Sequence, residues 1–414
     1  MSNPIKVRNG GVHLSVRDVT DWSSLRTSAQ SDPKGFAHKC DELVSRKVLS
    51  FRTMAQRGQS VKEMQAALAD VVVDGWDAQS KRTIQTSAFP ALTGIMAVEG
   101  ITEAYEEVPT IGQFIVTESD DNKKSTVRLG VLSQEAPTGR TGVQEGQPFP
   151  LLNASEEKFW LGHRRDGCRV VITQELFEEN DLGEIVSRLD RCGQYAAKSI
   201  EKQTLRRVMD VDGSGATPAE PYVLHGPNGG GAGVQLYTTT ANSPGTRAPS
   251  GTRINNNALV DTSDLENARV RLTIMNEPNG DPIPVNASDQ VLLVPDALLM
   301  TAWKILNSDM EPGVFNEANF YGGRGMFRPR LLSSVFLDDR STTAWYLGAF
   351  MRQFVRKWKL RPEAIVLPGT ADGAAQSFLD ARIGYQARIA WDMEVGAIDY
   401  VYVVQSLAAT TAPS

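Results

Sequence analysis

The feature that most constrains this fold is one long amphipathic helix, predicted over residues 180–208. Asp181 with Glu184 three residues later forms a capping-box-like start, and cationic side chains crowd the end, which suits the helix dipole. At 1.5 Å per residue the helix would span roughly 42 Å, far more than an average helix. The apolar stripe of this helix consists of Leu182, Ile185, Val186, Leu189, Cys192, Ala196 and Ile200. We expect such a solitary long helix among strands to act as a spine.

The segment before the helix, from Pro109 to Thr173, has the pattern of strands. Val127 and Leu129 alternate with polar neighbours, and the stretch 158–173 ends in a β-branched run. Between these strands lies the loop 130–150, which contains TGRTGVQEGQPFP. Adjacent strands normally close with two to five residues, so we predict an unusually long hairpin.

Residues 1 to about 100 are weakly patterned and read as an extended arm with short helices. We predict helices at 36–55 and 61–76, and a break at Pro90.

Beyond residue 210 the pattern mixes helices and strands. We predict a loop at 225–251, a helix with an Asp-capped start at 260–276, a buried strand then a helix at 289–306, strands within 327–350, and two strands within 381–404 that join at 394–397. The order of strands, long helix and mixed elements predicts an α+β fold and not a regular βαβ series.

The composition and net charge of the chain exclude several classes of protein. The 414 residues are 41% hydrophobic and 22% charged, which is ordinary for a globular chain, and the net charge of -6 is opposite to that of a basic nucleic-acid binder. The three cysteines, Cys40, Cys168 and Cys192, are odd in number and widely spaced, which favours reduced thiols. The N-terminus lacks a signal-peptide pattern, and no apolar window reaches membrane-span length. We expect a soluble chain in a reducing compartment.

Motifs for chemistry are missing. Neither glycine-rich run is followed by the Lys-Ser or Lys-Thr of a P-loop, and Gly231-Ala232-Gly233 lacks the third glycine of a dinucleotide fingerprint. Asp210 opens a calcium-like loop, but its twelfth position is Pro221, where a glutamate belongs. The four histidines form no zinc motif, and no G-x-S-x-G elbow exists. We predict no catalytic residue, cofactor or metal, although a hydrolase with dispersed site residues stays open as a distant alternative.

The order of elements resembles the major capsid (head) proteins of tailed bacteriophages with the Hong Kong 97 capsid fold, and is most similar to the Mu-like head-subunit branch. TSAFPALTGI and EAYEEVP within 86–109 resemble that branch's entry into its hairpin, and 173–205 resembles the segment that contains the spine helix. DQVLLVPDALLMTAWKIL, RPRLLSSVFLDDRSTTAWYLGAF and ARIGYQARIAWDMEVGAIDYVYVV resemble the axial domain and closing strands. The resemblance runs over about residues 84–405.

The resemblance implies a division into an N-terminal arm, an extended loop with its supporting strands, a peripheral domain and an axial domain. In this sequence they would be 1–108 for the arm, 109–172 for the extended loop, 173–254 with 376–414 for the peripheral domain with its spine helix (181–208), and 255–375 for the axial domain. The implied function is self-assembly, as pentamers and hexamers, into an icosahedral head. That shell would enclose double-stranded DNA without sequence-specific binding.

The resemblance also implies binding partners and a location for the protein. The implied partners are further copies of the chain, a portal protein, and a scaffold or decoration protein, with no membrane. The implied location is the virion shell, assembled in the bacterial host cytoplasm. We expect an unprocessed N-terminal arm and a separate scaffold or none. The alternative within the same fold is the shell of a bacterial nanocompartment, similar to encapsulins, that encloses an enzyme.

Candidate site residues lie on the loop and on the spine helix. Arg140 and Glu145 are predicted inter-subunit ion-pair partners and Phe149 an apolar anchor. The spine-helix candidates are Arg188, Arg191, Lys198 and Lys202.

Some relatives join subunits covalently through a lysine near the loop tip and an asparagine in the peripheral domain. Here the loop region GQPFPLLN has no lysine, the nearest being Lys158, Lys123 and Lys124, and the strand DARIGYQARIAW has no asparagine. We therefore predict a shell without covalent cross-links.

Overall fold

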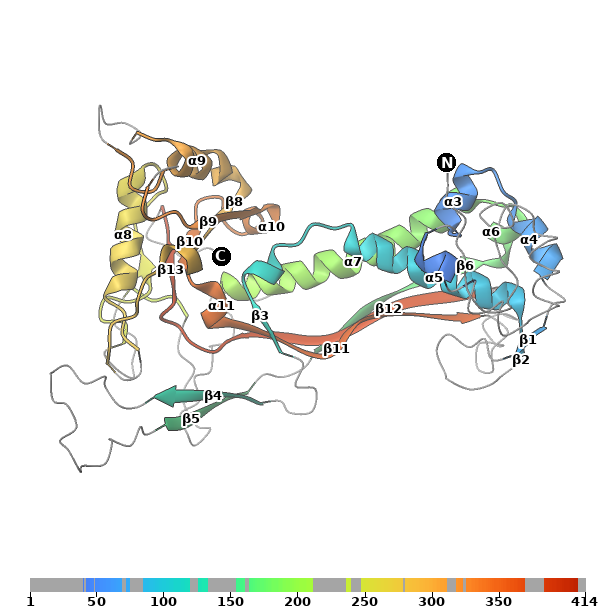
Figure 1. Ribbon diagram of the computed structural model, residues 1–414, viewed down its shortest axis with the longest axis horizontal. Coiled ribbons are helices and arrows are strands. Elements are labelled where there is room, and N and C mark those ends of the chain that lie inside the picture. The colour runs from blue at the N-terminus through green and yellow to red at the C-terminus, as the bar shows by residue number, and fades with distance from the viewer. Residues whose placement is uncertain are drawn as a thin grey trace, which may run out of the picture. The chain divides into compact units, whose positions relative to one another are not determined.

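The computed structural model describes residues 40, 42–47, 49–68, 72–74, 85–119, 126–132, 154–160, 164–210, 236–239, 247–277, 280–310, 318–322, 325–368 and 383–408 (Figure 1). The chain divides into two units. The first consists of Met1–Pro109, Arg165–Ser199 and Leu360–Trp391, and the second of Thr110–Arg164, Ile200–Lys359 and Asp392–Ser414. Helices and strands occur in both, so the predicted α+β class is confirmed.

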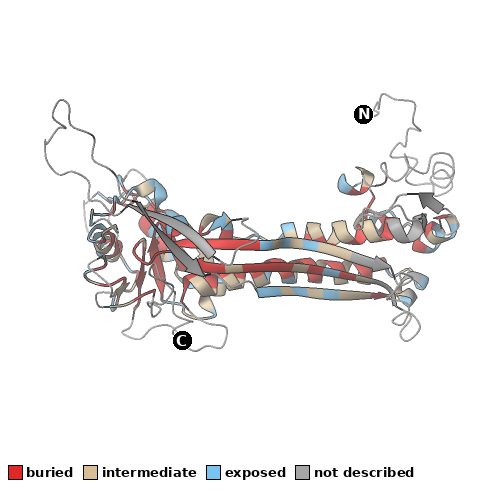
Figure 2. Ribbon diagram, turned by 90° about the horizontal axis from the view of Figure 1, so that it is seen from below, coloured by how far each residue is buried: buried red, intermediate tan, exposed pale blue. Residues whose placement is uncertain are grey.

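Helices dominate the first unit. Its helical elements are α3 (Phe51–Gln56), α4 (Val61–Leu68), α5 (Ala88–Glu106), α6 (Gln174–Glu178) and the N-terminal part of α7 (Leu182–Val208). α7 has 27 residues, and Oδ1 of Asp181 accepts a hydrogen bond from the Glu184 amide at 3.0 Å. The predicted long helix and its aspartate cap are therefore confirmed. Buried and exposed residues both occur along α7, as in an amphipathic helix (Figure 2).

α5 and α7 approach each other closely at a glycine. A Cβ on Gly193 would lie 2.4 Å from the Ile101 carbonyl oxygen and 2.8 Å from Cβ of Ala104. The α5 backbone occupies the space that any side chain would need, so the helix crossing requires glycine here.

Two further sheets are found among the described residues, one of four strands and one of two. A four-stranded sheet has the order β3-β11-β12-β6. Its members are β3 (Thr117–Ser119), β11 (Phe354–Pro368), β12 (Ile383–Ala397) and β6 (Arg164–Thr173). β3 is parallel to β11, with Thr117 opposite Val355. A separate antiparallel pair joins β1 (Val72–Asp74) to β2 (Gln85–Ser87).

The core of the second unit is a five-stranded mixed sheet with the order β7-β13-β10-β8-β9. Its strands are β7 (Arg253–Ile254), β8 (Val291–Pro295), β9 (Arg330–Ser334), β10 (Trp345–Gly348) and β13 (Val403–Ser406). β8 pairs in parallel with β9, and β10 pairs antiparallel with β8 and β13. All residues of β8, β10 and β13 are buried, which explains the near-continuous apolar sequences of β8 and β10.

Helices pack on this sheet. They are α8 (Thr262–Thr273), α9 (Asp296–Asn307), α10 (Val335–Asp338) and α11 (Phe350–Gln353), with 3₁₀ turns η2 (Gly112–Phe114) and η3 (Ala287–Asp289). α8 contacts β13 and β10, and α9 contacts β8 and β9. A reciprocal capping box between Asp261 and Asp264 starts α8, as the predicted aspartate cap requires. The strand and helix predicted at 289–306 are confirmed as β8 and α9.

The predicted hairpin is confirmed in its strands. β4 (Thr126–Leu132) pairs antiparallel with β5 (Ala154–Trp160), from Thr126 opposite Trp160 to Leu132 opposite Ala154. The loop TGRTGVQEGQPFP lies outside the described residues.

Three predictions for the N-terminal segment are wrong. The helix predicted over 36–55 is interrupted, because Ser50 caps a new helix by accepting from the Thr53 amide at 3.1 Å. The helix predicted over 61–76 ends at Leu68, and the β-branched pair that follows belongs to β1. Pro90 does not break α5, because it is the third residue of the helix, where no intrahelical N–H bond is lost.

Two predictions for the C-terminal half also need correction. The joint placed at 394–397 lies inside β12, which continues through Ala397, and β13 begins only at Val403. The stretch within 327–350 holds strands β9 and β10 but also the short helix α10. The loop predicted at 225–251 is not contradicted, because its described residues, 236–239 and 247–251, form no helix or strand. Leu236 and Tyr237 of this loop are nevertheless fully buried in the core of the second unit.

Candidate functional site

A buried glutamate anchors the C-terminal part of α7 within the second unit. Glu201 is 2% exposed and accepts hydrogen bonds from the amides of Ile111 at 2.9 Å and Gly112 at 3.1 Å. Burial raises the pKa of the Glu201 carboxyl, while the two amides and the positive charge of Arg356 act in the opposite direction. The two amides and Arg356 therefore favour the charged form of Glu201 against the effect of its burial.

Arg356 of β11 is the cationic member of this cluster. It is 6% exposed, donates to Oγ1 of Thr204 at 2.7 Å and lies 3.4 Å from a carboxylate oxygen of Glu118 in β3. A Cβ on Gly112 would lie 2.5 Å from its guanidinium nitrogen Nη2. Together these contacts tie α7 to η2, β3 and β11. We name Glu201, Thr204, Arg356 and Glu118 the buried ionic cluster.

A second buried carboxyl lies just past the end of α7. Asp210 is 5% exposed, has a left-handed backbone conformation (φ 58°), and its Oδ1 has no hydrogen-bond partner among the described residues. Burial raises the pKa of Asp210 to about 6, against the lowering effect of the Leu236 amide and nearby arginines. Close by, the Tyr237 hydroxyl donates to the Val208 carbonyl at 2.8 Å and satisfies one of the free carbonyls at the helix end.

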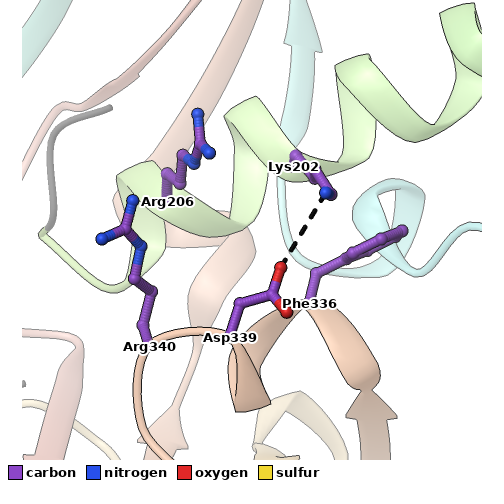
Figure 3. A pocket seen from close by; sticks show the side chains of 5 residues that line it. All are labelled: Lys202, Arg206, Phe336, Asp339 and Arg340. Carbon is purple, nitrogen blue, oxygen red and sulfur yellow. Dashed lines mark ion pairs between the residues drawn. The ribbon is translucent and has the colours of Figure 1, made fainter. Parts of the chain in front are cut away.

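The solvent-facing side of α7 near its end borders a basic hollow of about 160 Å³ (Figure 3). The lining residues are Lys202 and Arg206 from α7, Phe336 from α10, and Asp339 and Arg340 from the turn after α10. Lys202 lies 3.8 Å from the Asp339 carboxylate and 5.1 Å from the centre of the Phe336 ring. Figure 3 shows this pair on one side of the hollow and both guanidinium groups on the other.

Large apolar side chains are exposed mainly in the second unit. Of the eleven found among the described residues, only Tyr195 belongs to the first unit. Several lie on α9 and the segment after it: Met300 is 63% exposed, Trp303 55%, Met310 59% and Met326 87%. Trp303 also lines a groove of about 430 Å³ with Asn307 and Arg328. Exposed apolar surface of this kind typically marks an interaction site.

The four predicted spine-helix residues do not form one site. Nε of Arg188 donates to Glu184 at 2.8 Å, and Nη1 donates to the Val171 carbonyl of β6 at 3.1 Å, so this arginine helps hold the fold. Arg191 and Lys198 are exposed on α7, and only Lys202 belongs to the basic hollow.

The three predicted loop residues are outside the described part of the chain. Arg140, Glu145 and Phe149 therefore stay predictions, and no contact is assigned to them.

Sequence reasoning missed the buried ionic cluster and the two arginines of the hollow. A signal for the cluster exists: Glu201 follows Ala197 by four residues and precedes Val208 by seven, which places a carboxylate on the buried face of the helix. Arg340 has no comparable signal, because only the fold brings it to α7.

The three cysteines are free thiols, two of which are neighbours in the first unit. The thiol of Cys168 donates to the Cys192 carbonyl at 3.4 Å. A hydrogen bond with Cys192 lowers the pKa of the Cys168 thiol and raises that of its partner. The spacing of the cysteines in the sequence did not predict this proximity.

The described residues include neither a cluster suited to a metal ion nor a helix suited to a membrane span. In the described part of the chain, no group of three or more His, Cys, Asp or Glu side chains is arranged to hold a metal ion. Within the described ranges, no helix has both the length and the apolarity needed to cross a bilayer.

Three solved structures similar to this chain are distant from it in sequence. A virus-like particle from Pyrococcus furiosus matches with a TM-score of 0.41 and 8% identity, over 75% of this chain and 97% of that one. The capsid of cyanophage P-SCSP1u matches with a TM-score of 0.43 and 11% identity, over 73% of this chain and 89% of that one. The Mycobacterium phage Che8 structure gives a TM-score of 0.41 and 11% identity, over 72% and 92%. Similarity at this level assigns no function, and no curated protein matches the chain.

The sequence match to a protein family is the decisive comparison. Residues 167–408, more than half of the chain, match the family described as phage capsid protein. The match begins in β6 and extends through the long helix, the five-stranded sheet and β13. The chain therefore belongs to the phage capsid protein family and is a structural protein of a capsid shell.

Proposed function

We propose that this chain is the major capsid subunit of a tailed bacteriophage, and that copies of it assemble as pentamers and hexamers into an icosahedral head around double-stranded DNA. The observation that supports assembly best is the exposure of large apolar side chains on α9 and the segment after it, led by Met326 and Met300. A monomer gains nothing from leaving these side chains in water, whereas burial against a second copy would stabilise the contact.

The proposed organisation is that of the Hong Kong 97 fold, in its Mu-like branch. A 27-residue helix, an antiparallel pair β4–β5 on either side of a long loop, and a separate mixed sheet covered by α8 and α9 support a spine, an extended loop and an axial domain. The division at 1–108, 109–172, 173–254 with 376–414, and 255–375 is part of this proposal. So are the portal, scaffold and decoration partners and assembly in the host cytoplasm.

Expression of the full chain alone, followed by negative-stain electron microscopy, tests assembly. Shells, or rings of five or six subunits, support the proposal, and a monomer at high concentration contradicts it. Trp303→Ser should weaken assembly, whereas Lys304→Ser, an exposed polar position on the same helix, should not. If both variants assemble equally well, α9 does not belong to the interface between copies.

The cargo separates the phage head from the nanocompartment alternative. Particles purified from the native source should contain double-stranded DNA, and an enclosed enzyme without nucleic acid would favour the nanocompartment. The family assignment supports a structural protein over the soluble hydrolase.

Covalent cross-links are tested on the same particles. Because neither the loop GQPFPLLN nor the strand DARIGYQARIAW carries the required pair of residues, a denaturing gel should show a monomer band. A ladder of multimers with no monomer would refute the uncross-linked shell.

A further inference from the structure

The basic hollow at the end of α7 has more positive charge than its own residues neutralise. Lys202, Arg206 and Arg340 face one carboxylate, Asp339. That carboxylate lies beside Lys202 at 3.8 Å, on the side of the hollow away from the two guanidinium groups (Figure 3). Neither Arg206 nor Arg340 forms an ion pair with any described residue.

The arrangement is unusual for the surface of this protein. The chain is acidic overall, with a net charge of -6, and several other arginines of the second unit are paired: Arg207 with Glu394, Arg269 with Glu266, and Arg352 with Asp289. Two guanidinium groups on one side of a small hollow repel each other unless an anion lies between them.

We propose that this hollow is a binding site for a phosphate oxyanion. Two planar guanidinium forks and one ammonium offer more donors than the two oxygens of a carboxylate can accept in good geometry, whereas a phosphate offers up to four oxygens. The excess of two positive charges also matches a phosphate better than a single carboxylate. Phe336 closes one wall and holds the Lys202 ammonium over its ring, which fixes the third donor.

Two sources supply phosphate oxygens: free inorganic phosphate, whose charge and four oxygens match the hollow by themselves, and the phosphodiester backbone of DNA. Each phosphodiester has only two non-bridging oxygens and a single negative charge, so two adjacent phosphodiesters would be needed to match the excess charge of the hollow. The site does not depend on the proposed assembly, because all its residues belong to the second unit of one chain.

Inorganic phosphate, titrated into the full chain at constant ionic strength with chloride as reference, is the first probe. Phosphate should raise the thermal unfolding midpoint, since a ligand of the folded state stabilises it. Arg206→Gln and Arg340→Gln should each weaken phosphate binding by about tenfold, as expected for loss of a charge-assisted hydrogen bond. Asp339→Asn should strengthen phosphate binding, because it removes the carboxylate that competes with phosphate for the Lys202 ammonium. Arg191→Gln, an exposed arginine of α7 outside the hollow, is the matched control and should bind as the wild type does.

A short DNA duplex, followed by fluorescence anisotropy, identifies the source. Weaker duplex binding by the double variant Arg206→Gln/Arg340→Gln, but not by Arg191→Gln, assigns the site to DNA phosphates. If the double variant binds the duplex as the wild type does but no longer responds to inorganic phosphate, the site binds the free ion. The proposal is overturned if phosphate shifts the midpoint of the double variant as much as that of the wild type. It is also overturned if phosphate never stabilises the wild type while the double variant changes the oligomer size, since the hollow would then accept a carboxylate of a neighbouring copy.

Discussion

Replacement of Arg356 by methionine tests whether the buried ionic cluster holds the end of α7. The substitution keeps an unbranched side chain in a site that is 6% exposed but removes the charge. It deletes the hydrogen bond to Thr204 at 2.7 Å and leaves Glu201, itself 2% exposed, without its cation. Loss of one partner from a buried ionic contact costs about 3–5 kcal/mol. The contact with Glu118 adds little, because Glu118 is 36% exposed and 3.4 Å away. We therefore expect the free energy of unfolding to fall by about 3 kcal/mol at pH 8.

The pH dependence separates charge from packing. Burial already raises the pKa of Glu201, and Arg356 is one of the groups that lower it, so its removal must raise that pKa further. A carboxyl with a raised folded-state pKa stabilises the protein below its unfolded-state pKa, and this contribution is lost as the pH rises through the folded-state value. Each unit of additional shift is worth about 1.4 kcal/mol. The deficit of Arg356→Met should therefore shrink by about 1 kcal/mol or more between pH 8 and pH 5.

Urea unfolding of the full chain at both pH values, followed by tryptophan fluorescence, measures this deficit. Arg352→Met is the matched control, because Arg352 and its partner Asp289 are each 43% exposed. It should cost less than about 1 kcal/mol at either pH. A deficit for Arg356→Met that is the same at pH 5 and pH 8 would show that only packing is lost, and the electrostatic reasoning would be wrong.

Three further changes have expected outcomes. Asp210→Asn should stabilise the protein by about 1–3 kcal/mol at pH 8 and by little near pH 4, because the pKa of Asp210 is raised to about 6. Asparagine tolerates the left-handed backbone conformation at this position. An equal effect at both pH values in chemical denaturation would contradict this prediction. Gly193→Ala should lower the thermal unfolding midpoint, with a cost of about 1–3 kcal/mol from overpacking against α5. Gly183→Ala in the same helix is the control and should raise the midpoint, because a Cβ there would lie 3.5 Å from Oδ1 of Asp181, its nearest neighbour. A higher midpoint for both variants would refute the close crossing of α5 and α7. Asp261→Ala should cost about 1 kcal/mol through loss of the α8 cap, and an unchanged urea midpoint would show that the capping box is not needed.

The elements predicted correctly from the sequence are those whose ends and faces are encoded locally. α7, α8 and α9 have periodic apolar positions, and the first two have aspartate caps whose side chains bond the first-turn amides as expected. The hairpin strand β4 shows its alternation in the same local way, at Val127 and Leu129. These signals depend on residues two to four positions apart, so they can be recognised without knowledge of the tertiary structure.

The failures arise where a tertiary partner or a competing local bond decides the outcome. The sequence predicts a joint between strands at 394–397, yet Arg207 of α7 donates a hydrogen bond to the Val395 carbonyl at 2.9 Å and β12 continues through this point. Ser50 competes with helix continuation by capping the next helix. β11 was not predicted, although it supplies Arg356, because its charged residues are buried only by partners far away in the sequence. The arginines of the hollow were missed for the same reason.

The last two turns of α7 give two roles to one helix. Glu201, Thr204, Leu205 and Val208 are buried, while Lys202 and Arg206 remain partly exposed. At 100° per residue these sets lie on different faces, so the helix is anchored by one face and presents positive charge on the other. The two sites share no hydrogen-bond or ion-pair partner among the described residues. Changes at sites without shared partners usually add. Arg356→Met should therefore leave the affinity for phosphate intact, and Arg340→Gln should leave the pH dependence of unfolding intact. A measured coupling between the two would mean that α7 shifts as one body when either face is altered, and the two roles could then not be separated.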